Sequence, residues 1–181
     1  TWNQLQALYL NLAADEKDPA LARAYNVRAL LAIERAQAQG YLTSPRDNYT
    51  RVAILFNLAQ YGVAADLLET GLAARTIEST RRNWELLATA YQQSHREERA
   101  LATLDRAVAL FADQPDLEFA LAQNLYSAGR IAEAYTRAEA ALARPGLSKP
   151  GQVRLYLAFA AYELQRYEDA QKWVDAARAG G

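Results

Sequence analysis

The stretch NWELLATAYQQSHREERALATLDRAVAL, residues 83–110, contains two apolar patterns separated by a polar turn. The first pattern places Trp84, Leu87, Ala88 and Tyr91 on one helical face, since their spacings of three and four residues match the helical repeat. The second pattern repeats small or aliphatic residues at the same helical spacing from Ala100 onward. This stretch therefore predicts two amphipathic helices that pack against each other as a hairpin.

The second pattern recurs along the whole chain at intervals of 34 to 36 residues. In each copy an alanine is followed four residues later by an aliphatic residue or alanine, and seven residues later by another small residue. Small residues on one helical face let a neighbouring helix approach closely, and a fixed period indicates a repeat architecture. The three positions are occupied by Ala29, Ile33 and Ala36, then Ala64, Leu68 and Gly71, Ala100, Leu104 and Ala107, Ala134, Ala138 and Ala141, and Ala170, Val174 and Ala177.

The first pattern precedes each of these alanines and fills the space between helices with bulky side chains. Its copies begin at Trp2, Tyr49 and Trp84, with weaker copies around Leu121 and Leu157. The first copy departs from the others, because Ala29 follows Tyr9 by 20 residues whereas Ala100 follows Tyr91 by 9. An insertion around ADEKDPALARAY must therefore lengthen a helix or form a loop.

These residues resemble the tetratricopeptide repeat (TPR) family, which has two helices in a period of about 34 residues. The resemblance implies an all-α fold, a right-handed α-solenoid of about five helix-turn-helix repeats with a concave inner surface. The repeats are approximately 1–40, 41–79, 80–114, 115–149 and 150–181, and they form a single solenoid that we interpret as a piece of a longer array. The turn glycine usual in the family is present as Gly129 but is replaced by His95 and Gln165 elsewhere.

Composition argues against several function classes. The net charge is −1 and no block of like charges occurs, which argues against a nucleic-acid partner because such a partner needs a basic stripe. No apolar run approaches the roughly 20 residues of a membrane span, so we expect no membrane insertion. The chain has no cysteine, and its one histidine, His95, lies in a predicted turn without a positioned partner. We therefore predict no enzymatic activity, no catalytic residue, no metal site and no cofactor.

The family resemblance also implies a binding site, because first-helix residues that point away from the core line the concave face in TPR proteins. Amides there can satisfy peptide backbone groups, and aromatic rings can anchor a partner. For Tyr156, Phe159 and Tyr162 the alternative of packing against adjacent helices stays open. The acidic and polar character of this face argues against a partner whose C-terminal carboxylates are clamped by basic residues. The predicted peptide-binding groove consists of Asn57, Glu85, Thr89, Gln92, Gln93, Phe119, Gln123, Tyr126, Tyr156, Phe159 and Tyr162.

The two ends of the sequence carry no polar capping helix, although repeat arrays need one for solubility. Trp173 and Val174 on the last predicted helix are therefore either exposed or covered by a missing element or a second copy. This predicts a possible homodimer through an uncapped end.

A narrower resemblance concerns residues 40–72, 82–107 and 146–170. These stretches are similar to C-terminal repeats of Gram-negative TPR proteins encoded beside the TonB–ExbB–ExbD energy-transducing system. The resemblance implies a periplasmic accessory scaffold with TonB-system components as possible partners.

Three hypotheses for function follow from these observations. The favoured one is a non-enzymatic protein–protein interaction scaffold that binds a peptide segment in the concave groove, in the periplasm. The first alternative is a helical accessory region of a larger envelope or cell-wall enzyme. The second is a cytoplasmic regulator that senses a signalling peptide.

Overall fold

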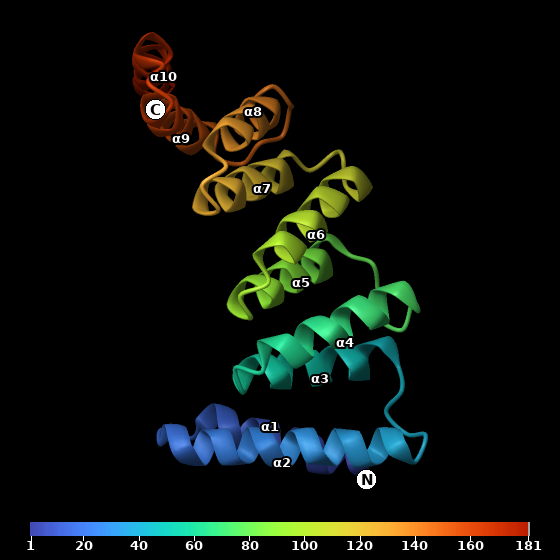
Figure 1. Ribbon diagram of the computed structural model, residues 1–181. Helices are drawn as coiled ribbons and strands as arrows, with labels where there is room; N and C mark the ends of the chain where they lie inside the picture. The colour runs from blue at the N-terminus through green and yellow to red at the C-terminus, as the bar shows by residue number, and fades with distance from the viewer. Residues whose placement is uncertain (181) are drawn as a thin grey trace. The chain divides into compact units, whose positions relative to one another are not determined.

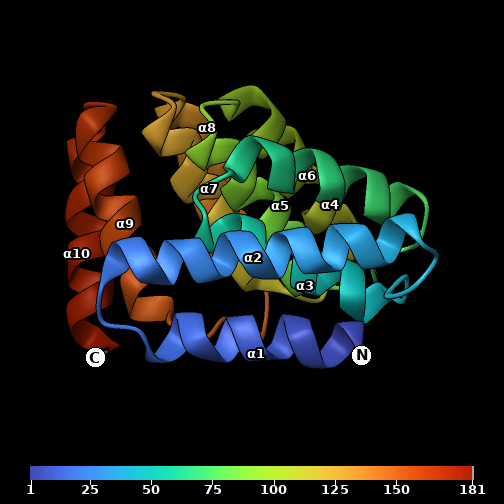
Figure 2. The ribbon, with the colours of Figure 1, turned by 90° about the horizontal axis from the view of Figure 1, so that it is seen from below.

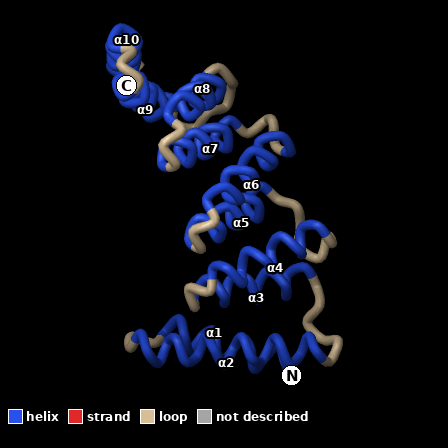
Figure 3. Tube along the Cα trace, viewed as in Figure 1, coloured by secondary structure: helices blue, strands red, loops and turns tan. Residues whose placement is uncertain are grey.

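The computed structural model describes residues 1–180, so Gly181, the last residue of the fifth predicted repeat, lies outside the described residues. Within this range the chain folds into ten helices joined by turns and loops (Figure 3), which confirms the predicted all-α class. The helices are α1 (Trp2–Asp15), α2 (Pro19–Ala38), α3 (Pro45–Asn57), α4 (Tyr61–Ala73), α5 (Arg81–Gln93), α6 (Glu97–Leu110), α7 (Pro115–Ser127), α8 (Ile131–Leu142), α9 (Pro150–Glu163) and α10 (Tyr167–Ala179).

The ten helices divide into two compact units, one from Thr1 to Arg96 and one that begins at Glu97. The boundary lies inside the third predicted repeat, between α5 and α6. In the first unit α1 packs along α2 and α3 packs on α4 (Figures 1 and 2). In the second unit the pairs are α7 with α8 and α9 with α10. About five helix-turn-helix repeats are therefore confirmed, whereas a single continuous solenoid stays a prediction.

Proline and small polar residues fix where the helices begin. Pro45, Pro115 and Pro150 stand in the first turns of α3, α7 and α9, where a missing backbone N–H costs nothing. Ser44 adds a capping box to α3, because its hydroxyl accepts from the Asp47 N–H and the Asp47 carboxylate accepts from the Ser44 N–H. Proline therefore marks the start of three of the first helices.

The insertion in the first repeat lengthens α2 and forms no long loop. α2 has 20 residues and begins ten residues before Ala29, whereas α8 begins three residues before the equivalent Ala134. The seven additional residues correspond to about two helical turns. Asp18 caps this extension, since its carboxylate accepts from the Ala20 N–H at 2.8 Å.

The predicted small-residue face is buried in four of the five second helices. Ala29, Ala64, Ala100 and Ala134 are each at most 1% exposed. At Gly71 the side chain of Ile77 lies so close that an added Cβ would be 2.6 Å from the Ile77 Cδ1 atom. In α10 the same face is only partly covered, because Ala170 is buried while Val174 and Ala177 are half-buried.

The turns inside the second to fifth repeats share one backbone conformation whatever residue occupies them, whereas the chain is extended at Glu16 in the turn of the first repeat. The second residue after the helix end has φ values of 56° at Ala59, 58° at His95, 76° at Gly129 and 59° at Gln165. Two reverse-turn hydrogen bonds close each turn, for example His95 N–H to Gln92 C=O at 2.9 Å and Arg96 N–H to Tyr91 C=O at 2.8 Å. This is the Schellman arrangement, which favours glycine because a Cβ is strained at positive φ.

A buried carboxylate joins three helices of the second unit. Glu118 on α7 is 2% exposed, and its two oxygens pair with Arg137 on α8 at 2.9 Å and Arg144 at 3.3 Å. Arg137 also binds Asp105 of α6. The hydrogen bond that Arg137 donates to Glu118, together with the negative charges of Glu118 and Asp105, raises the pKa of Arg137 above its ordinary value. The network satisfies a charge that would otherwise be costly to bury, and we assign it a structural role.

We predict that Ala134→Leu lowers the free energy of unfolding by about 1–3 kcal/mol, because the larger side chain overpacks a fully buried helix contact. Ala132→Leu on the exposed side of the same helix is the matched control and should change stability by less than about 0.5 kcal/mol. Chemical denaturation followed by circular dichroism measures both. Equal stability of the two variants would show that the assigned face of α8 is wrong.

A second prediction concerns the turns. Gly129→Ala should lower the free energy of unfolding by about 1–2 kcal/mol, since the position has a φ of 76° and open space around it, which leaves backbone strain as the only cost. Gly151→Ala, in the first turn of α9 and also in open space, should leave stability unchanged or raise it by up to about 1 kcal/mol. Thermal unfolding measures both variants, and a loss of stability of similar size at both glycines would refute the turn assignment.

Candidate protein-binding surface

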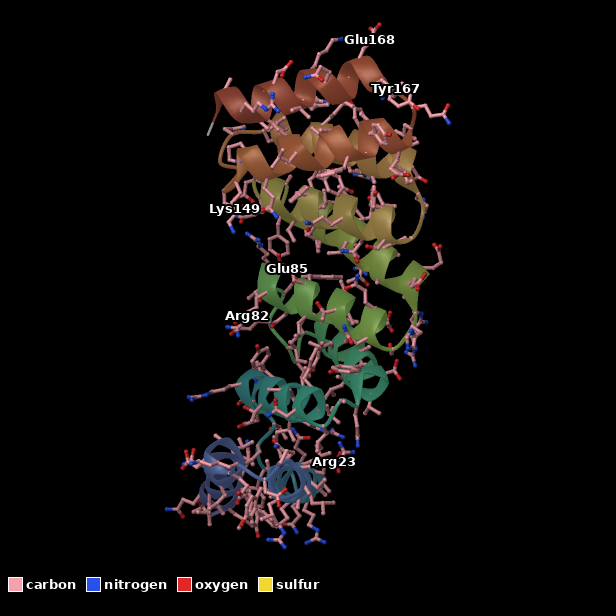
Figure 4. All side chains as sticks on the ribbon, turned by 90° about the vertical axis from the view of Figure 1, so that its left-hand side faces the viewer. Arg23, Arg82, Glu85, Lys149, Tyr167 and Glu168 are labelled. Atoms are coloured by element: carbon pink, nitrogen blue, oxygen red, sulfur yellow. The ribbon has the colours of Figure 1, made fainter. Side chains whose placement is uncertain are left out.

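The predicted site residues of the first unit are polar and lie on α3 and α5. Glu85 and Thr89 lie one turn apart on α5, where Glu85 pairs with Arg81 at 3.0 Å and the Thr89 hydroxyl donates to the Glu85 carbonyl at 2.9 Å. Figure 4 labels Glu85 together with its helix neighbour Arg82. Gln92 and Gln93 are exposed at the end of α5. Thr89, Gln92 and Gln93 are therefore exposed and Glu85 is partly covered, and their role in binding a peptide stays a prediction.

Asn57 is exposed at the end of α3 and points to α2. Its side-chain amide donates to the Asn26 side-chain oxygen at 3.2 Å, and the Asn26 amide in turn donates to the Ala22 carbonyl at 3.0 Å. Because Asn26 is only 8% exposed, this contact helps to satisfy a buried amide. Asn57 thus contributes to the packing of α2 on α3 as well as to the surface.

Three of the predicted aromatic residues pack between α7 and α9. Phe119 is 8% exposed, and its ring meets the ring of Tyr156 edge-on at 5.2 Å. The Tyr126 ring lies 5.7 Å from the same Tyr156 ring. The Tyr156 hydroxyl donates to the Ala122 carbonyl at 2.7 Å, and burial raises the pKa of Tyr156 above its usual range. The packing alternative thus holds for Tyr156, and Phe119 belongs to the core instead of an open surface.

Phe159 and Tyr162 are placed differently, because both are exposed on α9. Their exposed fractions are 69% and 63%, the highest of the large hydrophobic residues in the described chain. Tyr167, at the start of α10 (Figure 4), is 58% exposed and stacks edge-on against Tyr162 at 5.4 Å. Gln123, the remaining predicted residue, is exposed on α7. Among the predicted aromatic residues, the strongly exposed ones are therefore Phe159 and Tyr162 on α9, and Tyr167 of α10 lies against Tyr162.

A cleft of about 500 Å³ lies between α9 and α10 beside these aromatic residues. Ala158 and Ala170 are buried residues of its lining, and Phe159, Tyr162 and Tyr167 are exposed residues of the same lining. None of its lining residues carries a charge. The cleft is lined by Leu155, Ala158, Phe159, Tyr162, Tyr167, Ala170, Gln171 and Val174.

Sequence reasoning placed Phe159 and Tyr162 in the site but missed the half that α10 supplies. Tyr167, Gln171 and Val174 lie at spacings of three and four residues on one face of α10, and this pattern was available in the sequence. The sequence analysis used only Val174, as a residue of the repeated small-residue pattern that is either exposed or covered by another element. Trp173, half-buried, points instead to the preceding helix pair, where its indole N–H donates to the Tyr135 hydroxyl at 2.9 Å.

Charged residues lie outside the lining of the cleft. Within residues 1–180, no group of three or more histidine, aspartate or glutamate side chains is placed to hold a metal ion. His95 is exposed in the turn after α5, as the sequence predicted. Near the cleft, the Arg166 guanidinium binds Asp169 at 2.6 Å, and that hydrogen bond holds the pKa of the Asp169 carboxyl below its ordinary value. No helix among the described residues combines the length and apolar character of a membrane span.

Comparison with known proteins shows the fold and no closer relationship. No protein-family description matches the sequence, and no curated protein matches it. Among solved structures, the chain is similar to MamA, with 15% identity, a TM-score of 0.67 and coverage of 86% of this chain and 88% of that chain. MamA from Desulfovibrio magneticus gives 16% identity, a TM-score of 0.66 and coverage of 96% and 93%. The C-terminal part of a TPR repeat-containing protein from Cytophaga hutchinsonii gives 17% identity, a TM-score of 0.69 and coverage of 98% and 63%. The chain therefore has a TPR-like fold.

We predict that Tyr156→Phe lowers the free energy of unfolding by about 1 kcal/mol, because it removes the hydrogen bond to the Ala122 carbonyl. Tyr162→Phe, on an exposed ring, should change the free energy of unfolding by less than about 0.5 kcal/mol.

The raised pKa of Tyr156 means that folding favours its neutral form. The contribution of the neutral Tyr156 hydroxyl to the free energy of unfolding is fully present below pH about 10 and is lost as the pH rises above that value. Chemical denaturation of the unmodified chain and of both variants, at pH values below and above 10, measures the hydrogen-bond effect and the pH effect. If Tyr156→Phe lost as much stability at alkaline pH as the unmodified chain, the predicted pH effect of Tyr156 would be contradicted.

Proposed function

We propose that this protein is a non-enzymatic scaffold that binds a segment of a partner protein, with the cleft between α9 and α10 as its main contact. The observation that carries this proposal is the uncharged cleft of about 500 Å³ with Phe159, Tyr162 and Tyr167 exposed at its edges. A TPR-like fold supports the same conclusion, because repeat proteins present extended binding surfaces.

The energetics favour protein binding at this place over other roles. Aromatic side chains dominate binding energy at protein interfaces, since they bury a large area for a small loss of side-chain entropy. Leu155 is 49% exposed and adds an aliphatic contact beside Phe159. An uncharged lining favours an apolar or amphipathic segment, because a charged one would lose its hydration without a compensating ion pair.

The polar residues of the first unit extend the proposal. Thr89, Gln92 and Gln93 are exposed on α5, and amides of this kind can hydrogen-bond the backbone of an extended peptide. We assign them a secondary role in which they orient a bound segment, whereas the aromatic cleft supplies most of the affinity.

We further propose a periplasmic location and components of a TonB-type energy-transducing system as partners. The support for both is the resemblance of residues 40–72, 82–107 and 146–170 to the C-terminal repeats of TPR proteins encoded with TonB, ExbB and ExbD.

Affinity capture from a solubilised bacterial envelope extract, read by mass spectrometry, tests the proposal. We expect the chain to retain TonB-system components and the Phe159→Ser/Tyr162→Ser variant to retain at least about tenfold less, because two anchors are lost. Both side chains are more than 60% exposed, so the circular dichroism spectrum should stay helical.

The matched control for this experiment is Leu110→Ser, since Leu110 is 52% exposed on α6 and does not line the cleft. The Leu110→Ser variant should retain the same amount of TonB-system components as the unmodified chain. Equal capture by all three proteins would show that the cleft is not the binding site, and enrichment of other proteins in place of TonB-system components would remove the partner assignment.

A further inference from the structure

We propose that the pocket between the N-terminal parts of α3 and α5 binds an acidic segment of a partner protein, with Arg46 and Arg82 as the residues that bind its carboxylates. This inference rests on the proposed scaffold function and extends it, because it adds a second site with a different ligand chemistry. The pocket lies in the first unit, between two consecutive repeats, and shares no lining residue with the uncharged cleft on α9 and α10.

The pocket has a volume of about 280 Å³ and is lined by both apolar and polar residues. Pro45, Tyr49 and Ile77 are the apolar and aromatic members of its lining, and Ile77 is only 1% exposed. Small-molecule sites usually enclose about 300–1,000 Å³, so this volume suits one side chain of a partner better than a complete cofactor. A peptide that binds here would therefore place a single apolar side chain against these residues.

The loop that connects α4 with α5, residues 74–80, is held by hydrogen bonds from both neighbouring first helices. The Asn48 side chain of α3 donates to the Thr76 carbonyl at 3.0 Å, and the Asn83 side chain of α5 donates to the Glu78 carbonyl at 2.8 Å. The pocket is thus formed before a ligand binds, which lowers the ordering cost of binding.

Two arginine side chains beside the pocket have no carboxylate partner. Among residues 1–180 neither Arg46 nor Arg82 forms an ion pair or a side-chain hydrogen bond. The guanidinium carbon of Arg82 lies 5.9 Å from the centroid of the Tyr49 ring, and Figure 4 shows Arg82 projecting from α5. A guanidinium over an aromatic ring keeps its N–H donors free at its edge, where they can bind a carboxylate in a bidentate manner.

The acidic residues nearby do not neutralise these two charges. Asp47 caps the start of α3, and Glu85 forms an ion pair at 3.0 Å within α5. Glu78 is the acidic residue of the pocket lining, and it is exposed. The positive charges of Arg46 and Arg82 therefore exceed the negative charge of Glu78, so an acidic ligand is attracted and a basic one is repelled.

The two arginines are not placed where they would stabilise the helices. Both lie in the first turn, since α3 begins at Pro45 and α5 at Arg81, and a positive charge there opposes the helix dipole. The cation–π contact of Arg82 offsets this effect in part. We therefore expect Arg46→Gln/Arg82→Gln to shift the midpoint of thermal unfolding by less than about 4 °C. A loss of ligand binding in this variant would then report recognition and not folding.

The ligand that fits this pocket is a protein segment in which an apolar side chain stands between acidic ones. The apolar side chain would be buried against Tyr49 and Ile77, and the carboxylates would accept hydrogen bonds from the two guanidinium groups. A nucleic acid fits less well, because it needs a longer stripe of positive charge than two arginines provide.

Nuclear magnetic resonance titration of the isotope-labelled chain tests the inference. The probe is a synthetic peptide with blocked ends, in which one phenylalanine stands between pairs of glutamates, added up to about 1 mM. We expect saturable shifts of the amide signals around Thr80 and of the Trp84 indole signal, because the Trp84 indole N–H donates to the Ser79 hydroxyl at 2.9 Å beside the pocket lining. The indole signal of Trp173, on α10, should not move.

Changes to the probe separate the two parts of the proposed recognition. Glutamine in place of the glutamates should weaken binding by at least about tenfold, because charge-assisted hydrogen bonds are lost. Alanine in place of the phenylalanine should weaken binding by at least about fivefold, because the apolar contact is lost.

Variants of the chain test the residues. Arg46→Gln/Arg82→Gln should weaken binding of the glutamate peptide by at least about tenfold. Glu78→Gln should strengthen it by about two- to fivefold, because a like charge is removed, and a damaged fold cannot produce such a gain. Arg35→Gln makes the same charge change at an exposed position of α2 outside the pocket, so this matched control should bind like the unmodified chain.

The inference is overturned if no probe binds up to about 1 mM, if the glutamine peptide binds as tightly as the glutamate peptide, or if the double arginine variant keeps its affinity. The Phe159→Ser/Tyr162→Ser variant separates the inference from the proposed function, and it should bind the glutamate peptide like the unmodified chain. Loss of the peptide in that variant alone would assign the peptide to the cleft and remove only the second site. Envelope capture that ignores the cleft, together with peptide binding at the pocket, would remove the cleft from the proposed function and leave the second site in place.

Discussion

The constraint on which this structure depends is that a helix pair cannot cover both of its own apolar sides. The alanines at the contact between the two helices of a pair bring the helices together, and the bulky residues of the first helix fill the space that remains. One side of the pair still faces outward with residues such as Phe119 and Tyr135, and it is buried only when the next first helix lies on it. Stability in such a protein is therefore shared between neighbouring pairs.

The same constraint explains why one helix can serve both packing and recognition. On α9, Tyr156 points towards α7 and its hydroxyl donates a hydrogen bond to the Ala122 carbonyl, while Phe159, three residues later, is 69% exposed. A helix of this kind covers the pair before it and presents an uncovered face of its own. In the proposed function, a partner bound at the cleft would make the kind of apolar contact that already holds the repeats together.

Charged residues have a different task, which is to fix helices in place at the margins of the apolar contacts. Glu118 holds Arg137 and Arg144 from a buried position, and Arg51 pairs with Glu34 across α2 and α3 at 2.7 Å. The αL turns add strain at Ala59, His95 and Gln165, where a side chain occupies a position that suits glycine. Packing offsets this strain, and so the turn conformation persists without the favoured residue.

The sequence by itself determined the helical class, the five pairs and the faces on which they pack, because these depend on spacings of three, four and seven residues within one helix. It also placed Phe159 and Tyr162 on the surface that carries the proposed site. It could not decide between the two uses of an aromatic residue on α9, since Tyr156 and Phe159 belong to the same pattern. Only the tertiary structure resolved this, because the burial of Tyr156 and the opening of the cleft beside Phe159 depend on which neighbouring helix lies against each face.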